Sequence, residues 1–455
     1  MKNTILCCDI GTSSLKMGLI CEDGSVLKTN KFWHYKNTSQ FNIFSSYLDE
    51  FLLLAKDLLA SEENSDGAKI EPSAIAISGN GPSLIADLGE KKTFSFLWNE
   101  KVPDIQVSKQ GQTQAQAKVM SADEISICKN SMFLPRLLYF KSVYPEIFSS
   151  AQFISSAPEF FVHALTNCKP FTLLPEIRFK NAYWTEEQLA QLEKFGMKNI
   201  NLPPFTTLGS QSGFLAKEFL TEMGLSGTAK IPVFCSGPDF VAALIGTNTL
   251  EEGKICDRMG SSEGINLCTK DVAALNGASD STPNTIRTMP SVVEGLWNKS
   301  VIIEKSGSLI SNEKINSRWK AAPYDSYFKM ILTKSPHHYK NDEKVVEDTY
   351  KSFEKLLEKI QSAYKTLGIT NCPEHEHPII CTGQQAKSDD WLQFRANYLQ
   401  KTLARTTCPE SELIGNAIVA LATLNTTNDI QNAAEIKKIA AQVVKLDATF
   451  EPKIL

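Results

Sequence analysis

The chain has 455 residues, too many for one small hydrophobic core, so two domains are the default expectation. Apolar residues make up 42% and charged residues 22% of the sequence, and the net charge of −4 gives no reason to expect nucleic acid or a membrane surface as a partner. No apolar run approaches the roughly 20 residues that span a bilayer. The 11 cysteines are odd in number and form no C-x-x-C pair, which indicates reduced thiols in a cytoplasmic protein.

The first 80 residues combine short apolar runs with one amphipathic segment. Residues 4–9 and 15–21 are predicted strands because they are short, apolar and bounded by Gly, Ser and Asp. Asp23-Gly24 is a hairpin signal that leads into a further strand. Residues 47–63 have helical spacing of apolar side chains, and residues 73–79 are predicted to form a buried strand that ends in glycine. Strand, helix and strand in this order predict an α/β core.

The centre of the chain repeats the pattern of its beginning. Residues 105–170 are predicted to be mostly helical, and residues 230–246 to form a strand, a sharp Ser-Gly-Pro turn and a helix from about Asp239. The stretch RMGSSEGINLCT then has the same order of strand, small-residue turn and strand as DIGTSSLKMGLI near the N-terminus. Two such hairpins predict two related half-domains with facing loops, and we place the boundary near residue 246.

Three further segments of predicted structure lie in the C-terminal part of the chain. Residues 343–367 have apolar positions at helical spacing throughout. Residues 377–399 combine a strand, a polar turn and a helix. Residues 409–424 form a capped helix, and core packing explains any one of its residues about as well as a functional role does.

The two small-residue turns suggest anion binding. Backbone N–H groups at a tight Gly/Ser/Thr turn point outward and bind anions, and hydroxyl and ammonium groups add donors. Asp9, just before the first turn, is placed to bind a hydrated Mg²⁺ beside phosphate oxygens. A single D-x-G-T stretch is more often only a hairpin, but a second similar turn makes chance a weaker explanation. The candidate phosphate ligands of the first turn are Gly11, Thr12, Ser13, Ser14 and Lys16.

Asp239 is the candidate general base. Phosphoryl transfer depends mostly on positioning and charge stabilisation, with a carboxylate to take the proton of the acceptor hydroxyl. Asp239 begins a predicted helix after a Gly-Pro turn, a position suited to that role. The alternative is that Asp239 merely caps its helix.

These pieces follow the order and spacing of one known family. The stretches DIGTSSLKMGLICEDGSVL, SGPDFVAALIG, MGSSEGIN, TGQQAKSDDW and ESELIGNA resemble, in turn, the first phosphate loop, the catalytic-base segment, the second phosphate loop, the adenosine-side turn and the helix behind it in the FGGY carbohydrate kinases. The resemblance runs from about residue 4 to about residue 425 and is greatest to the xylulokinase branch. It implies an α/β protein of two actin-like (ribonuclease H-like) domains with a cleft between them, over residues 1–246 and 247–455.

The resemblance also implies ligands and the residues that bind them. It implies ATP and Mg²⁺ as cofactors and a small sugar or polyol as substrate, with a xylulose-like ketose as the best candidate, and it is compatible with a homodimer. Asp239 takes the role of general base. The residues assigned to the nucleotide, besides those of the first turn, are Gly260, Ser261, Ser262, Gly383 and Gln384. Those assigned to the substrate, besides Asp239, are Asn80, Gly81, Pro82, Trp98 and Asn99.

The acceptor side departs from the family pattern. The usual Gly-Gln-Met loop is replaced by Gly-Asn-Gly-Pro at 79–82, and the Trp-Asn-Asp-x-Arg stretch lacks its arginine at 98–102. The adenosine turn contains Gln384 and Gln385 in place of glycines, and the segment with Gly-Glu-Arg-Thr-Pro is absent between residues 300 and 342. The phosphate-handling residues therefore match better than the sugar-handling ones.

Two hypotheses follow. The first is an ATP-dependent sugar or polyol kinase, and the second is a catalytically weakened nucleotide- and sugar-binding protein of the same fold. Asp239 favours the kinase, because a pure binding protein has no need of a base there. A third, an actin- or chaperone-like ATPase, lacks a peptide-binding domain or filament insert. Trp98 is either a core residue or a wall for sugar stacking, and Glu263 is expected to be exposed.

Overall fold

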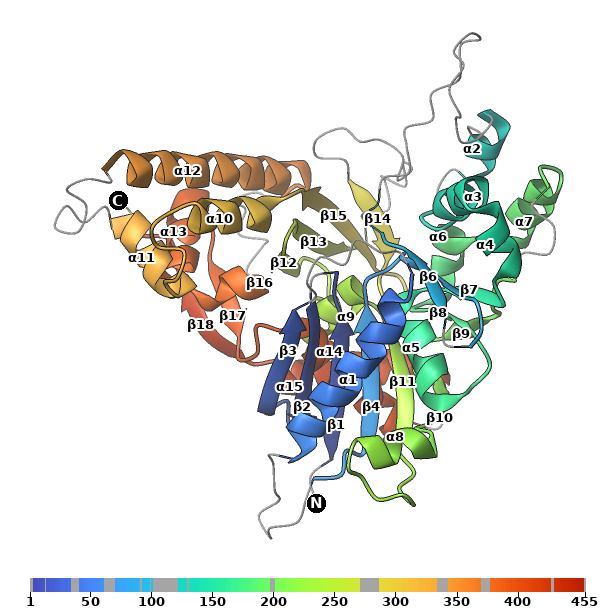
Figure 1. Ribbon diagram of the computed structural model, residues 1–455. Helices are drawn as coiled ribbons and strands as arrows, with labels where there is room; N and C mark the ends of the chain where they lie inside the picture. The colour runs from blue at the N-terminus through green and yellow to red at the C-terminus, as the bar shows by residue number, and fades with distance from the viewer. Residues whose placement is uncertain are drawn as a thin grey trace. The chain divides into compact units, whose positions relative to one another are not determined.

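The computed structural model divides into two compact units (Figure 1). The first contains Met1–Ala242 and Glu412–Ile439, and the second contains Ala243–Asn276, Asp280–Ser411 and Ala440–Leu455. The structure describes residues 3–12, 14–33, 41–60, 70–90, 92–98, 100, 122–128, 131–196, 201–270, 286–333, 343–369, 377–426 and 429–453.

The first unit is built on a six-stranded sheet in the order β10-β11-β4-β1-β2-β3. Strands β1 to β3 form an antiparallel meander, whereas β4 runs parallel to both β1 and β11. Every residue of β1 is buried, as expected for a strand covered on both faces. The bounds are β1 Thr4–Ile10, β2 Ser14–Cys21, β3 Val26–Trp33, β4 Ala74–Gly79, β10 Gln211–Phe214 and β11 Pro232–Pro238.

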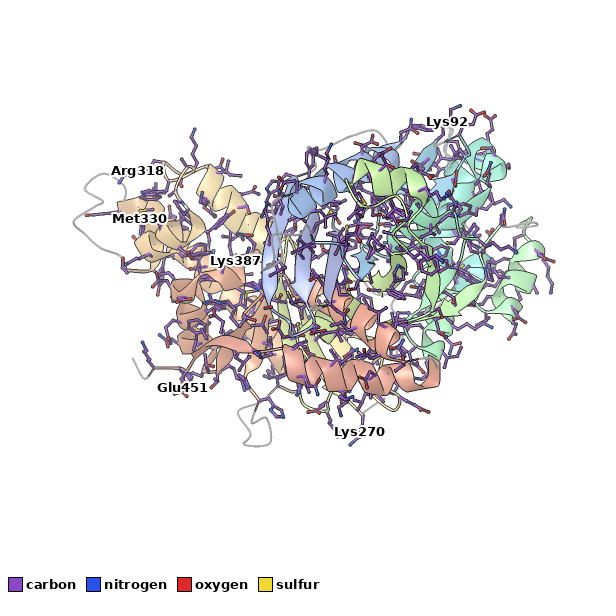
Figure 2. The ribbon with its side chains drawn as sticks, turned by 90° about the horizontal axis from the view of Figure 1, so that it is seen from below. Lys92, Lys270, Arg318, Met330, Lys387 and Glu451 are labelled. Atoms are coloured by element: carbon purple, nitrogen blue, oxygen red, sulfur yellow. The ribbon has the colours of Figure 1, made fainter. Side chains whose placement is uncertain are left out.

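Helices cover both faces of this sheet. Helix α1 (Ile43–Ala60) crosses one face, and α14 (Ser411–Asn425) lies on the opposite one (Figures 1 and 2). Helix α14 packs closely, because a Cβ added to Gly18 of β2 would lie 3.2 Å from Leu413 Cδ1. Helix α9 (Asp239–Gly246) follows β11 directly, and α15 (Asp429–Val443) follows α14.

Between β4 and β10 the first unit contains a mixed region. The prediction of a mostly helical segment over 105–170 holds in its described part, except that β7 pairs with β5 at Phe153–Ser155. Its strands are β5 Leu84–Asp87, β6 Thr93–Phe96, β7 Phe153–Ser155, β8 Thr172–Leu174 and β9 Phe205–Thr207. Its helices are α2 Ala122–Cys128, α3 Leu134–Val143, α4 Pro145–Ser150, α5 Ala157–Thr166, the 3-10 turn η1 Ile177–Phe179, α6 Lys180–Tyr183 and α7 Glu186–Glu193. Helix α8 (Lys217–Glu222) connects β10 to β11.

The second unit contains a seven-stranded sheet in the order β14-β15-β13-β12-β16-β17-β18, and its central strands repeat the arrangement of the first sheet. Strands β12, β13 and β15 are antiparallel neighbours, and β16 runs parallel to β12, as β4 does to β1. This confirms the two related halves predicted from the paired hairpins. The bounds are β12 Ile255–Met259, β13 Glu263–Thr269, β14 Arg287–Pro290, β15 Trp297–Ile303, β16 Ile379–Thr382, β17 Leu403–Thr406 and β18 Leu446–Phe450.

Helices α10 to α13 and the 3-10 turn η3 cover this sheet in the described part of the second unit. The prediction of a helix over 343–367 is confirmed by α12. Trp391 stacks on Phe328 with ring centroids 4.8 Å apart and meets Phe353 edge-on, so the buried core of this unit ties α11, α12 and α13 together. The bounds are α10 Ser306–Ile315, α11 Tyr324–Thr333, α12 Glu343–Thr366, η3 Gln384–Lys387 and α13 Asp389–Leu399.

The division between the units differs from the predicted one in its C-terminal part. The chain enters the second unit within α9, at Ala243, close to the predicted boundary at residue 246. The segment Glu412–Ile439 then returns to the first unit, although it was predicted to lie within the C-terminal domain. The physical reason is that α14 completes the first sheet's cover, and its Asn416 donates through Nδ2 to the carbonyl oxygen of Cys8, 2.7 Å away.

No helix among the described residues is both long enough and apolar enough to cross a bilayer.

Candidate functional site

In the first unit the candidate residues gather at the carboxyl ends of three neighbouring strands. The register pairs Ile10 of β1 with Gly79 of β4, and Gly79 with Pro238 of β11. Asp9, Asn80 and Asp239 lie at or beside these ends. Loops at the carboxyl edge of parallel strands are the usual ligand-binding place in α/β sheets. The pairing therefore brings together residues that lie 230 positions apart in the sequence.

Asp9 is a buried carboxylate with two polar contacts. The residue is 2% exposed, its Oδ1 accepts from Ser78 Oγ at 3.0 Å, and its Oδ2 lies 3.5 Å from Lys16 Nζ. Lys16 Nζ also lies 3.7 Å from Glu412 Oε2. Burial is the main cause that raises the pKa of Asp9 to about 7; Lys16 acts in the opposite direction, and the nearby charges of Glu412 and Asp239 contribute to the rise.

The donor set around Asp9 fits a hydrated magnesium ion. Glu412 and Asp239 both act electrostatically on Asp9, and Lys16 lies against Asp9 and Glu412. An excess of negative charge favours a divalent cation, and Mg²⁺ takes one or two carboxylates when phosphate oxygens and water supply the remaining ligands. Among the described residues no group of three or more His, Cys, Asp or Glu side chains forms a complete protein-only metal site.

The first small-residue turn is closed by its own backbone. Gly11 N donates to Ser14 O at 2.9 Å, and a Cβ on Gly11 would lie only 2.8 Å from that oxygen. A side chain at Gly11 would therefore force the turn open. Ser14 begins β2 and is 4% exposed, so it is less accessible than the predicted role of phosphate ligand assumes. Ser13 lies outside the described residues.

Thr12 links the turn to the candidate acceptor residues. Its Oγ1 accepts from Trp98 Nε1 at 2.7 Å and, at the longer distance of 3.4 Å, from Asn80 Nδ2. Both partners can only donate through these atoms, and a hydroxyl has two acceptor lone pairs. The proton of the Thr12 hydroxyl therefore points away from both partners and can be donated to a third group.

Hydrogen bonds also fix the loop that follows β4. Asn80 is 3% exposed, and its Oδ1 accepts from Ser83 Oγ at 2.9 Å. Ser83 Oγ in turn accepts from Trp98 N at 3.0 Å, and Arg136 donates to Trp98 O. Trp98 is half-buried and held by its indole N–H, which favours a wall of a site over a purely internal core residue. Asn99 lies outside the described residues.

Gly81 and Pro82 complete this loop on the side of β11. A Cβ on Gly81 would lie 3.7 Å from Pro238 Cβ, so the loop after β4 runs beside the end of β11. The structure thus brings Gly81 and Pro82 to the same edge as Asp239.

Asp239 is half-buried at the first position of α9. Its Oδ1 accepts from Phe240 N at 2.7 Å. Gly237, two residues earlier, has a φ of +79° and lies at an irregularity in the pairing of β11 with β4, which turns the chain sharply into the helix. This turn places the Asp239 carboxylate at the carboxyl edge of the sheet.

In the second unit Gly260 and Ser261 are exposed and Ser262 is half-buried, and the start of α10 holds this turn in place. Ser261 O accepts from Ser308 N at 3.2 Å, and Ser262 Oγ accepts from Lys305 N at 3.1 Å. A Cβ on Gly307 would lie 2.0 Å from Gly260 O, so only glycine permits this approach. Neither strand β15 nor the start of α10 was predicted from the sequence, although the small residues of KSGS are compatible with such a close contact.

The adenosine-side turn lies beside this second turn. Gly383 has a φ of +94°, and a Cβ there would lie 2.6 Å from Met259 O. Gln384 is exposed, but Gln385 is buried and its Oε1 accepts from Trp391 Nε1 at 3.2 Å. Gln385 is therefore part of the core and does not project outward with Gln384. Lys387, labelled in Figure 2, ends η3 and pairs with Glu410 at 2.8 Å.

One expectation for this turn is wrong. Glu263 was expected to be exposed, whereas it is completely buried at the start of β13. The reason is an ion pair with Arg395, whose NH2 lies 2.6 Å from Glu263 Oε1. A charged side chain alone predicts exposure, and its partner lies 132 residues away in the sequence.

Comparison with solved structures identifies the fold. The chain superposes on a ligand-bound xylulose kinase and a gluconate kinase, both from Lactobacillus acidophilus, with TM-scores of 0.72 and 0.71 and 15% identity to each. The alignments cover 99% and 100% of this chain and 94% of each of those chains. A Plasmodium falciparum glycerol kinase solved with ADP aligns at TM-score 0.67 and 16% identity, over 99% of this chain and 94% of that one.

These similarities show that the chain has the α/β fold of the FGGY carbohydrate kinases, as the sequence resemblance implied. No sequence-family profile matches the chain, and no curated protein matches it either.

Proposed function

We propose that the protein transfers a phosphoryl group from ATP to a hydroxyl of a small sugar or polyol. The observation that supports this most is the grouping of Asp9, Thr12, Asn80 and Asp239 at the carboxyl edge of β1, β4 and β11. A buried acid beside an anion-binding turn and a separate helix-start acid are the two carboxylates that a sugar kinase needs. The fold, shared with xylulose, gluconate and glycerol kinases, supports the same activity.

The residues divide into nucleotide and acceptor roles. Thr12 and Lys16, with the backbone of Gly11, are proposed to bind phosphate oxygens, together with Gly260, Ser261 and Ser262 of the second unit. Gly383 and Gln384 are proposed to lie against the adenosine. Asp9 would hold a hydrated Mg²⁺, which neutralises charge on the phosphates when bound.

On the acceptor side Asp239 is proposed to accept the proton of the attacking hydroxyl. The hydroxyl then attacks the γ-phosphorus, the bond from that phosphorus to the bridging oxygen breaks, and ADP leaves. Asn80 and Trp98 would orient the acceptor, because an amide and an indole face suit a neutral polyhydroxy compound. A xylulose-like ketose is the first candidate for the acceptor, because the chain shares its fold with a xylulose kinase.

A second candidate function is nucleotide and sugar binding with little turnover. Glu100, which stands where the family has its Asp, has an Oε1 that accepts from Leu97 N at 3.1 Å, so this oxygen closes its own loop. A side chain that in the family usually contacts the sugar is therefore replaced here by Glu100, which accepts a hydrogen bond within its own loop.

A substrate panel separates the two functions. The purified protein would be given ATP and Mg²⁺ with ketoses including D-xylulose, with polyols and with sugar acids, and ADP release would be measured above a control without acceptor. The kinase proposal expects acceptor-dependent ADP release with at least one ketose or polyol. If a sugar binds by calorimetry but no member of the panel stimulates ADP release, the binding function replaces the kinase function.

A further inference from the structure

A fully buried ion network lies beneath the second small-residue turn. Asp257, Glu263 and Arg395 are each 0% exposed, and Tyr364 is 2% exposed. Arg395 donates to Glu263 through both terminal nitrogens, from NH2 to Oε1 at 2.6 Å and from NH1 to Oε2 at 3.3 Å. The same NH2 donates to Asp257 Oδ2 at 2.7 Å, and Tyr364 OH donates to that oxygen at 3.0 Å.

The sheet register explains why these side chains meet. Strand β12 pairs with β13 so that Met259 lies opposite Glu263 and Asp257 opposite Ile265. Asp257 and Glu263 are therefore diagonal neighbours on one face of the sheet. Tyr364 of α12 and Arg395 of α13 reach that face from the helices that cover it.

The network holds two carboxyl groups for one guanidinium. Burial, and then the charge of Glu263, raise the pKa of Asp257 well above its ordinary value. Arg395 contacts Glu263 through both terminal nitrogens but Asp257 through only one, so the Glu263–Arg395 contact is the bidentate pair of the network.

Glu263 follows Ser262 directly, so the pair with Arg395 fixes the end of the turn. The start of α10 holds the other side of the turn through Ser261 O and Ser262 Oγ. The turn Gly260-Ser261-Ser262 is thereby held between two contacts, the buried ion pair of Glu263 with Arg395 and the backbone N–H groups of Lys305 and Ser308. A turn whose N–H groups are oriented before binding loses less conformational entropy when an anion arrives.

We propose that Glu263 and Arg395 are positioning residues that preorganise the turn 260–262 for the phosphates of the nucleotide. The inference rests on the proposed function, because that function assigns the turn to phosphate binding. Neither residue touches the ligand, and both act through the backbone of the turn.

The inference is tested by comparing two isosteric variants, Glu263→Gln and Asp257→Asn. Glu263→Gln replaces the carboxylate next to the turn by an amide of the same shape, so Arg395 loses the bidentate carboxylate partner that fixes the end of the turn, while Asp257 Oδ2 still accepts from Arg395. Asp257→Asn is the matched control, because it alters the same network but leaves the Glu263–Arg395 pair intact. Calorimetry with a non-hydrolysable ATP analogue would measure Kd, and hydrogen exchange would follow the amides of 260–262.

The expected result is a Kd raised roughly tenfold or more by Glu263→Gln, the effect of losing a charge-assisted hydrogen bond, with less than about a twofold change for Asp257→Asn. The amides of 260–262 should exchange faster only in Glu263→Gln. If that variant does not fold, Glu263→Asp keeps the charge, withdraws it by one methylene and should weaken binding in the same way.

The inference fails if the wild type binds the analogue and Glu263→Gln binds it equally well, or if both variants weaken binding to the same extent. A wild type that binds no nucleotide contradicts the proposed function instead. In that case hydrogen exchange decides the inference: unchanged exchange at 260–262 in Glu263→Gln overturns it, and selective acceleration supports it.

Discussion

At the scale of single residues, the structure shows how Thr12 and Asp9 differ from an ordinary hairpin. The hydroxyl oxygen of Thr12 accepts two hydrogen bonds, so its proton is directed to a third group. Asp9 is buried beside Lys16, and its pKa is raised. The sequence predicted the identity of these candidates from the D-x-G-T stretch. It could not predict their partners, because Trp98 and Ser78 lie 86 and 69 residues away and reach them only through the fold.

Trp98→Phe should uncouple the acceptor wall from the first turn. The variant keeps an aromatic face but loses the N–H that donates to Thr12, so kcat/KM for the best acceptor should fall about five- to tenfold, the effect of one neutral hydrogen bond of about 1 kcal/mol. Steady-state kinetics would measure this, with ATP affinity as the internal control.

A double-mutant cycle with Thr12→Val provides the decisive comparison. Because both changes remove the same hydrogen bond, their combined effect should be smaller than the sum of the single effects. Strict additivity would show that Trp98 and Thr12 act independently.

Asp9→Asn should stabilise the ligand-free protein at alkaline pH. The folded-state pKa of about 7 exceeds the ordinary value of 3.8, so the folded state binds the proton more tightly than the unfolded state. The stability that this proton provides is present below about pH 4 and is lost as the pH rises towards 7. Asparagine does not titrate, so the advantage of the variant should appear between these pH values and persist above them.

Thermal unfolding in EDTA without nucleotide would test this. At pH 8 the variant should unfold at least about 2–4 °C above the wild type, which corresponds to about 1 kcal/mol in a domain of 150–250 residues, and near pH 4 the two should converge. A less stable variant at pH 8 would mean that the Lys16 pair outweighs the cost of burying the carboxylate.

At the scale of elements, the local spacing of apolar residues predicted individual strands and helices. The hairpin β1–β2 and helix α12 follow directly from their apolar periods. Helix α14 was also predicted, but the pattern of apolar residues in a helix does not show which sheet the helix covers. The sequence therefore did not predict that Glu412–Ile439 belongs to the first unit. In η3 the sequence treated Gln384 and Gln385 alike, whereas the bond to Trp391 buries only the second.

Gly415→Ala should test how tightly α14 is fixed. A Cβ at Gly415 would lie 1.9 Å from Ala242 O, a backbone atom that cannot move without shifting α9. Overpacking of this kind costs about 1–3 kcal/mol, so the variant should lose stability and, because α9 begins with Asp239, activity as well.

Gly227→Ala is the matched control for this substitution. A Cβ there meets nothing within 4 Å, so thermal unfolding should show no loss of stability. Equal melting temperatures for the two alanine variants would contradict the close approach of α14 and α9.

At the scale of the whole molecule, the repeated strand order was predictable because the two hairpins are alike in sequence. The same order β3-β2-β1-β4-β11 and β15-β13-β12-β16-β17 occurs in the two sheets. The network around Arg395 could not be predicted, because its members come from two strands and two helices that only tertiary packing brings together. Long-range charge pairs of this kind leave no periodic signal in the sequence.

The central claim, that Asp239 is the base of an ATP-dependent sugar or polyol kinase, is tested most directly by Asp239→Asn. An amide keeps the shape of the carboxylate and its contact with Phe240 N, but it cannot accept the proton of the acceptor hydroxyl. Because asparagine is a comparably good helix N-cap, folding should be unaffected.

The measurement is kcat for the best acceptor, with the affinity for a non-hydrolysable ATP analogue measured alongside. The account predicts that kcat falls by roughly 10²–10⁴-fold while the nucleotide affinity and melting temperature remain close to those of the wild type. An Asp239→Asn protein that phosphorylates its acceptor at nearly the wild-type rate would contradict the claim and leave Asp239 as a helix cap.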